Sequence, residues 1–497
     1  MHTTSNDTYK LAKSLTTREA GYFSTWLISS KIAHASHYIT MLALMRKQEE
    51  YNEAVLIKKL GKNKVTENFT YHKTIMTTCL LDSLIDYSAK GSTDYQIHHL
   101  IEAARLVYER SLYTLATKLL EKARKEASHY EKHYLLFEIC NSERKLLKRV
   151  LPQDLKKALE ANSKEKKSLW KKIETEDAYS ALNDEIFALF VEHNRVKTTA
   201  ATAQQTAIKQ HPIMKDEPAA QRFDAKLKYH EIHALNNQLS GNPSSALYHR
   251  ELMMQLWDKH PHMISEMPMR HRIDLSALLS LRHENGKYQG FEELIQRIEN
   301  IKTPGNEEAD VTHFREVYYL RQLYLLNNNK WSEALNLIPK IEQGLKHHEK
   351  SIGQSRLFNF WYNIAITYLI CAEYKRCQTW VEKLLDISRN NTVRTDLRDF
   401  AAILLVILHY ETEKYELVEF HLRNVKDRLK RTNKLHQFEK IVLQFLGKLI
   451  SNRHHAAKTK EIRIQFLSAL EQLSRQQGNQ SLLGLDEIII WAKQKAA

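Results

Sequence analysis

Apolar residues recur along this chain at intervals of three and four positions, the spacing of one face of an α-helix. The clearest stretch contains two such runs separated by a short turn at Ala372-Glu373, namely Trp361 to Tyr368 and Tyr374 to Leu384. Small residues at Ala365 and Cys377 would let the two helices approach each other closely. The pattern therefore predicts a helical hairpin over 361–384.

The same hairpin pattern recurs on both sides of this unit, at intervals of about 40 to 45 residues. The first helices of the other predicted hairpins fall at 100–107, 230–237, 275–282, 318–325 and 402–409. This arrangement of aromatic and small residues resembles the tetratricopeptide repeat, a helix–turn–helix unit of about 34 residues, with lengthened helices or loops. The resemblance implies an all-α fold in which degenerate helix pairs form a right-handed superhelix, clearest over 311–425.

Three segments follow from this pattern. We predict an N-terminal helical head at 1–90, first helical hairpins with a lysine-rich segment (143–177) at 91–200, and a tetratricopeptide-like array at 201–497. The opening of the head, which includes Lys13-Ser14-Leu15-Thr16, Glu19 and Tyr22-Phe23, resembles uncharacterised helical-repeat proteins of Bacteroidota. That family implies a helical head before a repeat array and carries no assigned activity.

Composition supports long helices and a cytoplasmic setting. The chain of 497 residues has only 12 Gly and 8 Pro, the residues that most often interrupt regular elements. No secretory signal is visible at the start. The longest apolar run, 400–408, is too short to span a bilayer. Four cysteines without CxxC spacing favour free thiols in a reducing compartment.

The net charge of +15 is concentrated in two segments. Residues 141–172 carry eleven Lys/Arg against four Asp/Glu, and residues 421–463 carry twelve against three. Localised basic surface favours an acidic partner, such as an acidic protein, a nucleic acid or an anionic membrane surface. The commoner role of such segments is a solvated helix face that keeps a protein soluble.

Motifs for catalysis and cofactor binding are missing from the sequence. No phosphate-binding loop, GxGxxG, GxSxG or HExxH occurs. His230 and His233 share a helix face, but a third metal ligand cannot be identified, and zinc sites need three or four. We predict no enzymatic activity, no cofactor and no metal site.

The predicted array implies a concave groove lined by the first helix of each pair. Seven residues are the candidates for contacting a partner there, namely Glu316, Tyr319, Leu323, Asn359, Tyr362, Asn363 and Ile366. Asn363 matches an asparagine with which some members of the resembled family bind a peptide carboxylate, but Phe400 and Leu404 stand where basic residues would be required. The predicted function is a non-enzymatic scaffold that binds a peptide or helical partner in this groove.

The alternative is a nucleic-acid-associated regulator. Helices predicted at 52–60 and 66–88, separated by Gly61, could form a helix-turn-helix in the head, with the basic segments contacting phosphates. Tyr71, His72 and Lys73 are the candidates for reading bases.

Overall fold

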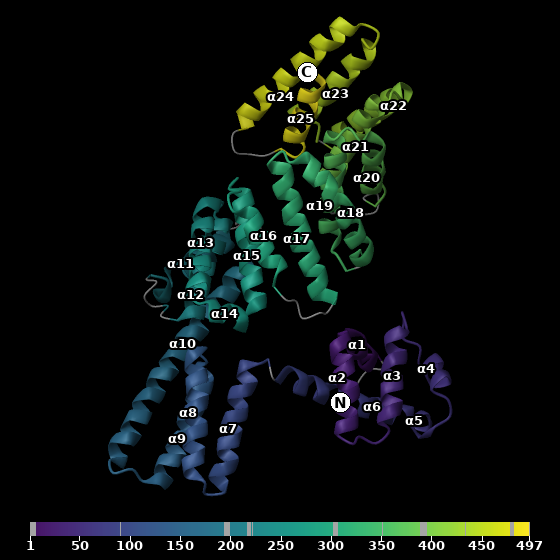
Figure 1. Cartoon of the computed structure of the whole chain (residues 1–497). Coiled ribbons are helices and arrows are strands. Elements are labelled where there is room, and N and C mark those ends of the chain that lie inside the picture. Colours follow the sequence, from purple (N-terminus) through teal and green to yellow (C-terminus); the bar gives the residue numbers. More distant parts are fainter. Residues whose placement is uncertain are drawn as a thin grey trace. The chain divides into compact units, whose positions relative to one another are not determined.

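A computed structural model describes residues 6–89, 91–192, 199–215, 220, 222–301, 307–349, 351–387, 395–432, 434–477 and 482–496. Over these ranges the chain forms 25 α-helices and one short 3-10 helix, with no strand, so the predicted all-α class is confirmed (Figure 1). Among these helices we find none whose length and apolar content would let it cross a bilayer.

The chain divides into two compact units. Unit 1 comprises residues 1–287 and 300–310, and unit 2 comprises residues 288–299 and 311–497. This division does not coincide with the boundaries at residues 90 and 200 that the sequence pattern indicates.

Unit 1 begins with the helices of the head, α1 (Asp7–Ser14), α2 (Thr17–Ser29), α3 (Ala35–Lys47), α4 (Glu53–Leu60), α5 (Lys64–Glu67) and α6 (Phe69–Ala89). A capping box starts α2: the Thr16 hydroxyl accepts from the Glu19 N–H at 3.2 Å, and the Glu19 carboxylate accepts from the Thr16 N–H at 2.7 Å. The helix predicted at 66–88 is interrupted, because Asn68 leaves helical geometry between α5 and α6.

The remainder of unit 1 is a series of longer helices, α7 (Thr93–Glu109), α8 (Tyr113–His129), α9 (His133–Val150), α10 (Leu155–Glu192), α11 (Thr199–Gln210), η1 (Pro212–Met214), α12 (Phe223–Leu239), α13 (Pro243–Lys259), α14 (Pro261–Glu266) and α15 (Pro268–Glu284). The lysine-rich segment 143–177 is helical at the end of α9 and over the first part of α10. Successive helices α7, α8, α9 and α10 pack side by side (Figure 1).

Unit 2 contains α16 (Phe291–Glu299), most of α17 (Glu307–Asn327), α18 (Trp331–His348), α19 (Gln354–Ile370), α20 (Tyr374–Ile387), α21 (Thr395–Glu411), α22 (Tyr415–Arg431), α23 (Gln437–Ser451), α24 (Ala456–Gln477) and α25 (Leu485–Ala496). The apolar run 400–408 lies within α21, and most of its residues are buried in the core of this unit.

One turn geometry recurs between paired helices. The residue two positions after the end of the first helix has a positive φ. The backbone N–H of the residue that follows it donates to the carbonyl oxygen five positions before that donor, at 2.8–3.0 Å. This is the Schellman arrangement, which satisfies carbonyls at the end of a helix. The positive-φ residues are Ser111, Glu131, Gly241, Gly286, Asn329, Ala372 and Glu413. From Gly241 onward they are spaced about 40 to 45 positions apart, so the hairpin interval predicted from sequence is present.

The hairpin of α19 and α20 packs as closely as its small residues predict. Ala365 and Cys377 are both fully buried. The Cys377 thiol donates to the Ala365 carbonyl oxygen at 3.1 Å, a contact that a larger side chain at either position would prevent. Burial raises the pKa of the Cys377 thiol well above its usual range.

Candidate functional site

Three of the seven predicted groove residues lie in the interior of unit 2. Tyr362, Asn363 and Ile366 on α19 are 7, 6 and 1 % exposed. The C-terminal helix α25 packs against α19, and it covers the side of α19 that carries Tyr362. In this arrangement these three side chains do not line an open groove, which corrects the expectation from the repeat pattern.

Polar contacts hold α25 against α19 at both ends. The Tyr362 hydroxyl donates to Glu487 Oε1 at 2.9 Å, and Gln494 Nε2 donates to the carbonyl oxygen of Ile370 at 3.1 Å. Burial raises the pKa of the Glu487 carboxyl, although the Tyr362 hydrogen bond acts in the opposite direction. The second half of α19, the first helix of a hairpin, is thus contacted by a helix from elsewhere in the unit.

Trp491 is the apolar anchor of α25. Its side chain is 1 % exposed and meets the rings of Phe445 and Phe466 edge-on, at centroid distances of 6.3 and 6.4 Å. Its indole N–H donates to Glu411 Oε1 at 3.2 Å, and Lys495 Nζ bonds to Glu411 Oε2 at 2.5 Å. Burial disfavours the charge of Lys495, but its contacts with Glu411 and Tyr374 together outweigh burial and raise its pKa.

The other four predicted groove residues are half-buried. Glu316, Tyr319 and Leu323 lie on α17, and Asn359 lies near the start of α19. The Tyr319 ring meets Phe360 edge-on at 5.6 Å. The seven residues therefore differ in their surroundings: three are buried on α19, where Tyr362 contacts α25, and four are half-buried on α17 and the first turns of α19.

Asn363 cannot serve as a carboxylate clamp in this arrangement. It is 6 % exposed, and its Nδ2 has no hydrogen-bond partner within the described part of the chain. Phe400 and Leu404, which replace the basic residues of such a clamp, are buried on α21.

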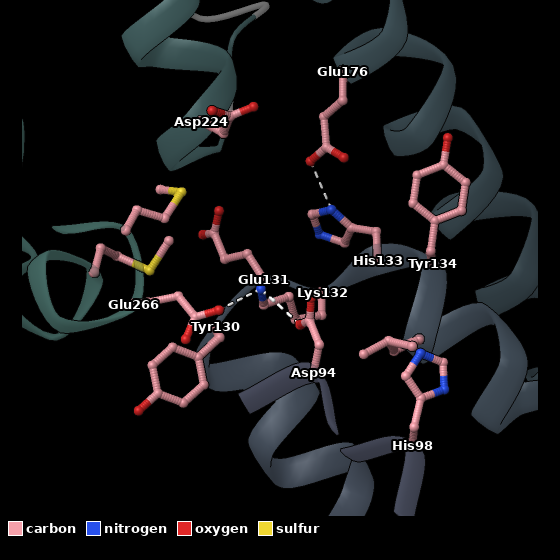
Figure 2. Close-up of a pocket in the computed structure, with 13 residues that line it drawn as sticks. Asp94, His98, Tyr130, Glu131, Lys132, His133, Tyr134, Glu176, Asp224 and Glu266 are labelled. Carbon is pink, nitrogen blue, oxygen red and sulfur yellow. Dashed lines mark hydrogen bonds and ion pairs between the residues drawn. The ribbon is translucent and has the colours of Figure 1, made fainter. Parts of the chain in front are cut away.

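Unit 1 contains a cavity of about 420 Å³ at the turn between α8 and α9 (Figure 2). Lys132 in this turn bonds to Asp94 Oδ1 at 2.8 Å and to Glu266 Oε1 at 2.5 Å. His133 Nδ1 lies 2.7 Å from Glu176 Oε1, and its side chain is almost fully buried. Figure 2 shows both pairs on the wall of the cavity. Lys132 and His133 are thus engaged by carboxylates, an arrangement that ties α7, α9, α10 and α14 together.

The histidines considered as metal ligands gain a neighbour in the structure. His249 on α13 stacks on His233 at 4.7 Å, and its Nδ1 lies 3.2 Å from Nδ1 of His230. Burial and the neighbouring histidines lower the pKa of His249 to about 4. Within the described ranges, no group of three or more His, Cys, Asp or Glu side chains has an arrangement that could hold a metal ion.

The head presents few of the side chains that a DNA reader would need. Tyr71 is 65 % exposed, but His72 and Lys73 are buried. His72 Nδ1 lies 2.8 Å from the Tyr38 hydroxyl, and Lys73 Nζ donates to Glu53 Oε2 at 2.8 Å. Two of the three candidate base-reading residues are therefore part of the core of the head.

No protein-family model, curated protein or solved structure matches this chain. The repeat resemblance therefore rests on the hairpin pattern and its turns. Sequence reasoning missed the role of α25, because local apolar spacing does not show that a helix packed against the preceding α24 also contacts the distant α19. Its signal was an apolar face at helical spacing, formed by Leu485, Ile488, Trp491 and Ala492.

Proposed function

We propose that this chain is a non-enzymatic scaffold with a tetratricopeptide-like superhelix, and that unit 2 binds a helical segment of a partner protein. The single observation that carries the proposal is the seating of α25 against α19. The face of α19 holds this amphipathic helix through polar contacts at both ends of α25, while Trp491 of α25 is anchored on α23 and α24. Such a face has the chemistry of helix-in-groove recognition.

The partner would contact the part of the face that α25 leaves half-buried. Tyr319 and Leu323 on α17 offer an aromatic and an aliphatic contact, and Glu316 and Asn359 offer polar groups at its edges. Aromatic residues of this kind contribute most to binding when a partner removes the remaining water around them. The partner helix would therefore lie beside α25 and would not need to displace it.

The nucleic-acid alternative has less support. His72 and Lys73 are engaged with Tyr38 and Glu53 inside the head, so they could reach a base only if the head rearranged.

Affinity purification from the native cells, followed by binding measurements with each purified partner, tests the scaffold proposal. Leu323→Glu places a charge on the proposed contact surface, and Phe420→Ala is a matched control on α22, where the ring is 58 % exposed. We expect a partner that binds the parent chain and the control equally, and binds Leu323→Glu at least about tenfold more weakly.

Circular dichroism must show that both variants are folded. If folded Leu323→Glu retains every partner at the parent affinity, the assignment of the binding face to α17 and α19 is wrong.

A further inference from the structure

A second pocket of unit 1, of about 470 Å³, lies between α11, α12 and α13 (Figure 1). Its wall consists of amides, hydroxyls, two histidines and one lysine, Lys209. Within the described part of the chain, every residue that lines it carries a polar group and none is an aspartate or a glutamate. A pocket with this lining favours a ligand that is both polar and negatively charged.

Asn236 on α12 directs a free donor into this pocket. The residue is 7 % exposed and lines the pocket. Gln205 Nε2 on α11 donates to the Asn236 backbone carbonyl oxygen at 2.9 Å and to its Oδ1 at 2.8 Å. The backbone contact fixes which end of the Gln205 amide faces Asn236, so Oδ1 accepts and Nδ2 points elsewhere. This Nδ2 has no hydrogen-bond partner among the described residues and retains exposed surface, so an acceptor oxygen of a ligand can reach it.

The charge of Lys209 acts inside the pocket. Lys209 is exposed near the end of α11, and it has no carboxylate partner among the described residues. Burial lowers the pKa of His233, and the charges of His230 and Lys209 act in the same direction. His249, which stacks on His233, also has a lowered pKa, of about 4. Positive groups thus oppose each other across this wall, and a bound anion would relieve their repulsion.

The first turn of α13 adds donors on the opposite side. Ser244 and Ser245 line the pocket in this turn. Asn242 caps the helix and accepts from the Ser245 N–H at 3.2 Å, whereas the Ser244 N–H precedes the first backbone bond within the helix, which Ala246 makes. Free N–H groups and the helix dipole make such an N-terminus favourable for an anion. One turn further on, the Tyr248 ring lines the entrance and is 59 % exposed.

We propose that this pocket binds a phosphate monoester. Its terminal oxygens would accept from Lys209 Nζ, from Asn236 Nδ2 and from the first turn of α13. A phosphate monoester has three strong acceptor oxygens and a charge of about −1.5 to −2 at neutral pH, whereas a carboxylate has two oxygens and one charge. The Tyr248 ring would contact the organic group that carries the phosphate. This site is independent of the helix-binding face proposed for unit 2.

Isothermal titration calorimetry with the full chain at constant ionic strength tests the site. The probes are inorganic phosphate, a phosphotyrosine peptide and ribose 5-phosphate, and their respective controls are acetate, the unphosphorylated peptide and ribose. We expect each phosphate compound to bind at least about tenfold more tightly than its control. Equal affinity for phosphate and acetate would overturn the proposal, because a single positive charge would then explain both.

The same phosphate chemistry occurs in a modified side chain of a partner protein and in a small metabolite, and two of the probes distinguish these sources. Tighter binding of the phosphotyrosine peptide than of ribose 5-phosphate would assign the site to a phosphorylated protein. The reverse order would assign it to a small molecule. Absence of binding by all three phosphate compounds would overturn the proposal.

Variants locate the binding site. Lys209→Glu reverses the charge on α11, and Lys259→Glu, at an exposed lysine in the last turn of α13, is the matched control with the same change in net charge. Ser245→Glu places a carboxylate in the pocket itself. An acidic residue in the first turn of a helix interacts favourably with the helix dipole, so this variant should fold.

We expect Lys209→Glu and Ser245→Glu each to weaken the phosphate compounds by about tenfold or more, with Lys259→Glu within about twofold of the parent. Circular dichroism checks that the variants are folded. Parent affinity in either folded pocket variant would overturn the proposal, since the phosphate would then bind elsewhere.

Discussion

The hydroxyl of Tyr362 donates a hydrogen bond to Oε1 of Glu487 at 2.9 Å and joins α19 to α25 across 125 positions of the chain. This contact changes the role of a residue that the repeat pattern would place on an open groove. Tyr362 holds a helix of its own chain, and the Phe400 ring at 5.8 Å completes its surroundings. The inner side of α19 is therefore part of the core of unit 2 where α25 covers it.

The docking of α25 should depend on pH through Glu487. Burial raises the pKa of this carboxyl in the folded chain, so its protonated form is favoured there. The stabilisation from protonation is fully present below the usual pKa of a free glutamate and is lost as pH rises through the raised folded pKa. The Tyr362 hydrogen bond lowers the pKa of Glu487, and the neighbouring Asp486 carboxylate adds to burial in raising it.

Glu487→Gln keeps an acceptor for Tyr362. We therefore expect this variant to be more stable than the parent at pH values above the pKa of Glu487 in the folded chain, and the melting temperatures of the two to converge in acid. Thermal unfolding across pH 4 to 8 measures the difference, with Glu419→Gln on the exposed side of α22 as the control. A loss of stability in Glu487→Gln that is the same at every pH would show that the ionisation of Glu487 does not control the docking of α25.

Trp491→Ala should be among the most damaging substitutions in unit 2. The change leaves a cavity beside Phe445 and Phe466 and removes the indole donor from Glu411. Loss of a buried aromatic side chain costs about 3–5 kcal/mol. Urea unfolding gives the total loss, and hydrogen exchange should show faster exchange in α25 and α19.

The matched control for this variant is Trp170→Ala, where the side chain on α10 is 52 % exposed. We expect that change to stay within about 0.5 kcal/mol of the parent. Comparable losses in the two variants would mean that the packing of α25 contributes little.

The hairpins could be predicted from sequence because each depends on local apolar spacing and on small residues at the close contact, as at Ala365 and Cys377. The turn residues gave a weaker signal. Ala372 and Glu413 adopt positive φ where glycine or asparagine would be usual, so composition alone does not mark these turns.

What the sequence could not give is the position of α25 against α19. The pairing of Tyr362 with Glu487 joins distant segments, and no local pattern specifies which face of a repeat a later helix will cover. Unit 1 shows the same limit. Asn162 on α10 and Leu120 on α8 line one cavity, but they are far apart in sequence and neither lies in a recognisable motif.

A buried ionic cluster in unit 1 was not predicted from the sequence either. We expect Asp274→Ala, which removes one of its carboxylates, to destabilise the chain. Asp274 is fully buried on α15, where it accepts from Trp257 Nε1 at 3.0 Å and from Arg270 Nε at 3.2 Å. Arg250 lies 3.5 Å away and also contacts Glu231. Removing the aspartate leaves the buried Arg250 and the partly buried Arg270 with one carboxylate, Glu231, between them.

Breaking a buried ion pair in this way costs about 3–5 kcal/mol. Differential scanning calorimetry measures the loss, and Asp177→Ala, an exposed carboxylate of α10, is the control. Equal melting temperatures for the parent and Asp274→Ala would show that the arginines find other partners or water.

Gly344→Ala should reverse the usual effect of replacing a glycine within a helix. Alanine is favoured over glycine in a helix interior by about 1 kcal/mol, so the change normally stabilises. At Gly344 in α18, however, an added Cβ would overlap the ring of Phe314 on α17, which must then shift within the core of unit 2. Overpacking of this kind costs about 1–3 kcal/mol, and we expect a net loss of stability.

Gly447→Ala in α23 is the matched control, because no atom lies within 4 Å of the added Cβ, and we expect it to stabilise. Urea midpoints of the two variants should move in opposite directions, and a stabilised Gly344→Ala would mean that α17 and α18 can separate at this contact without cost.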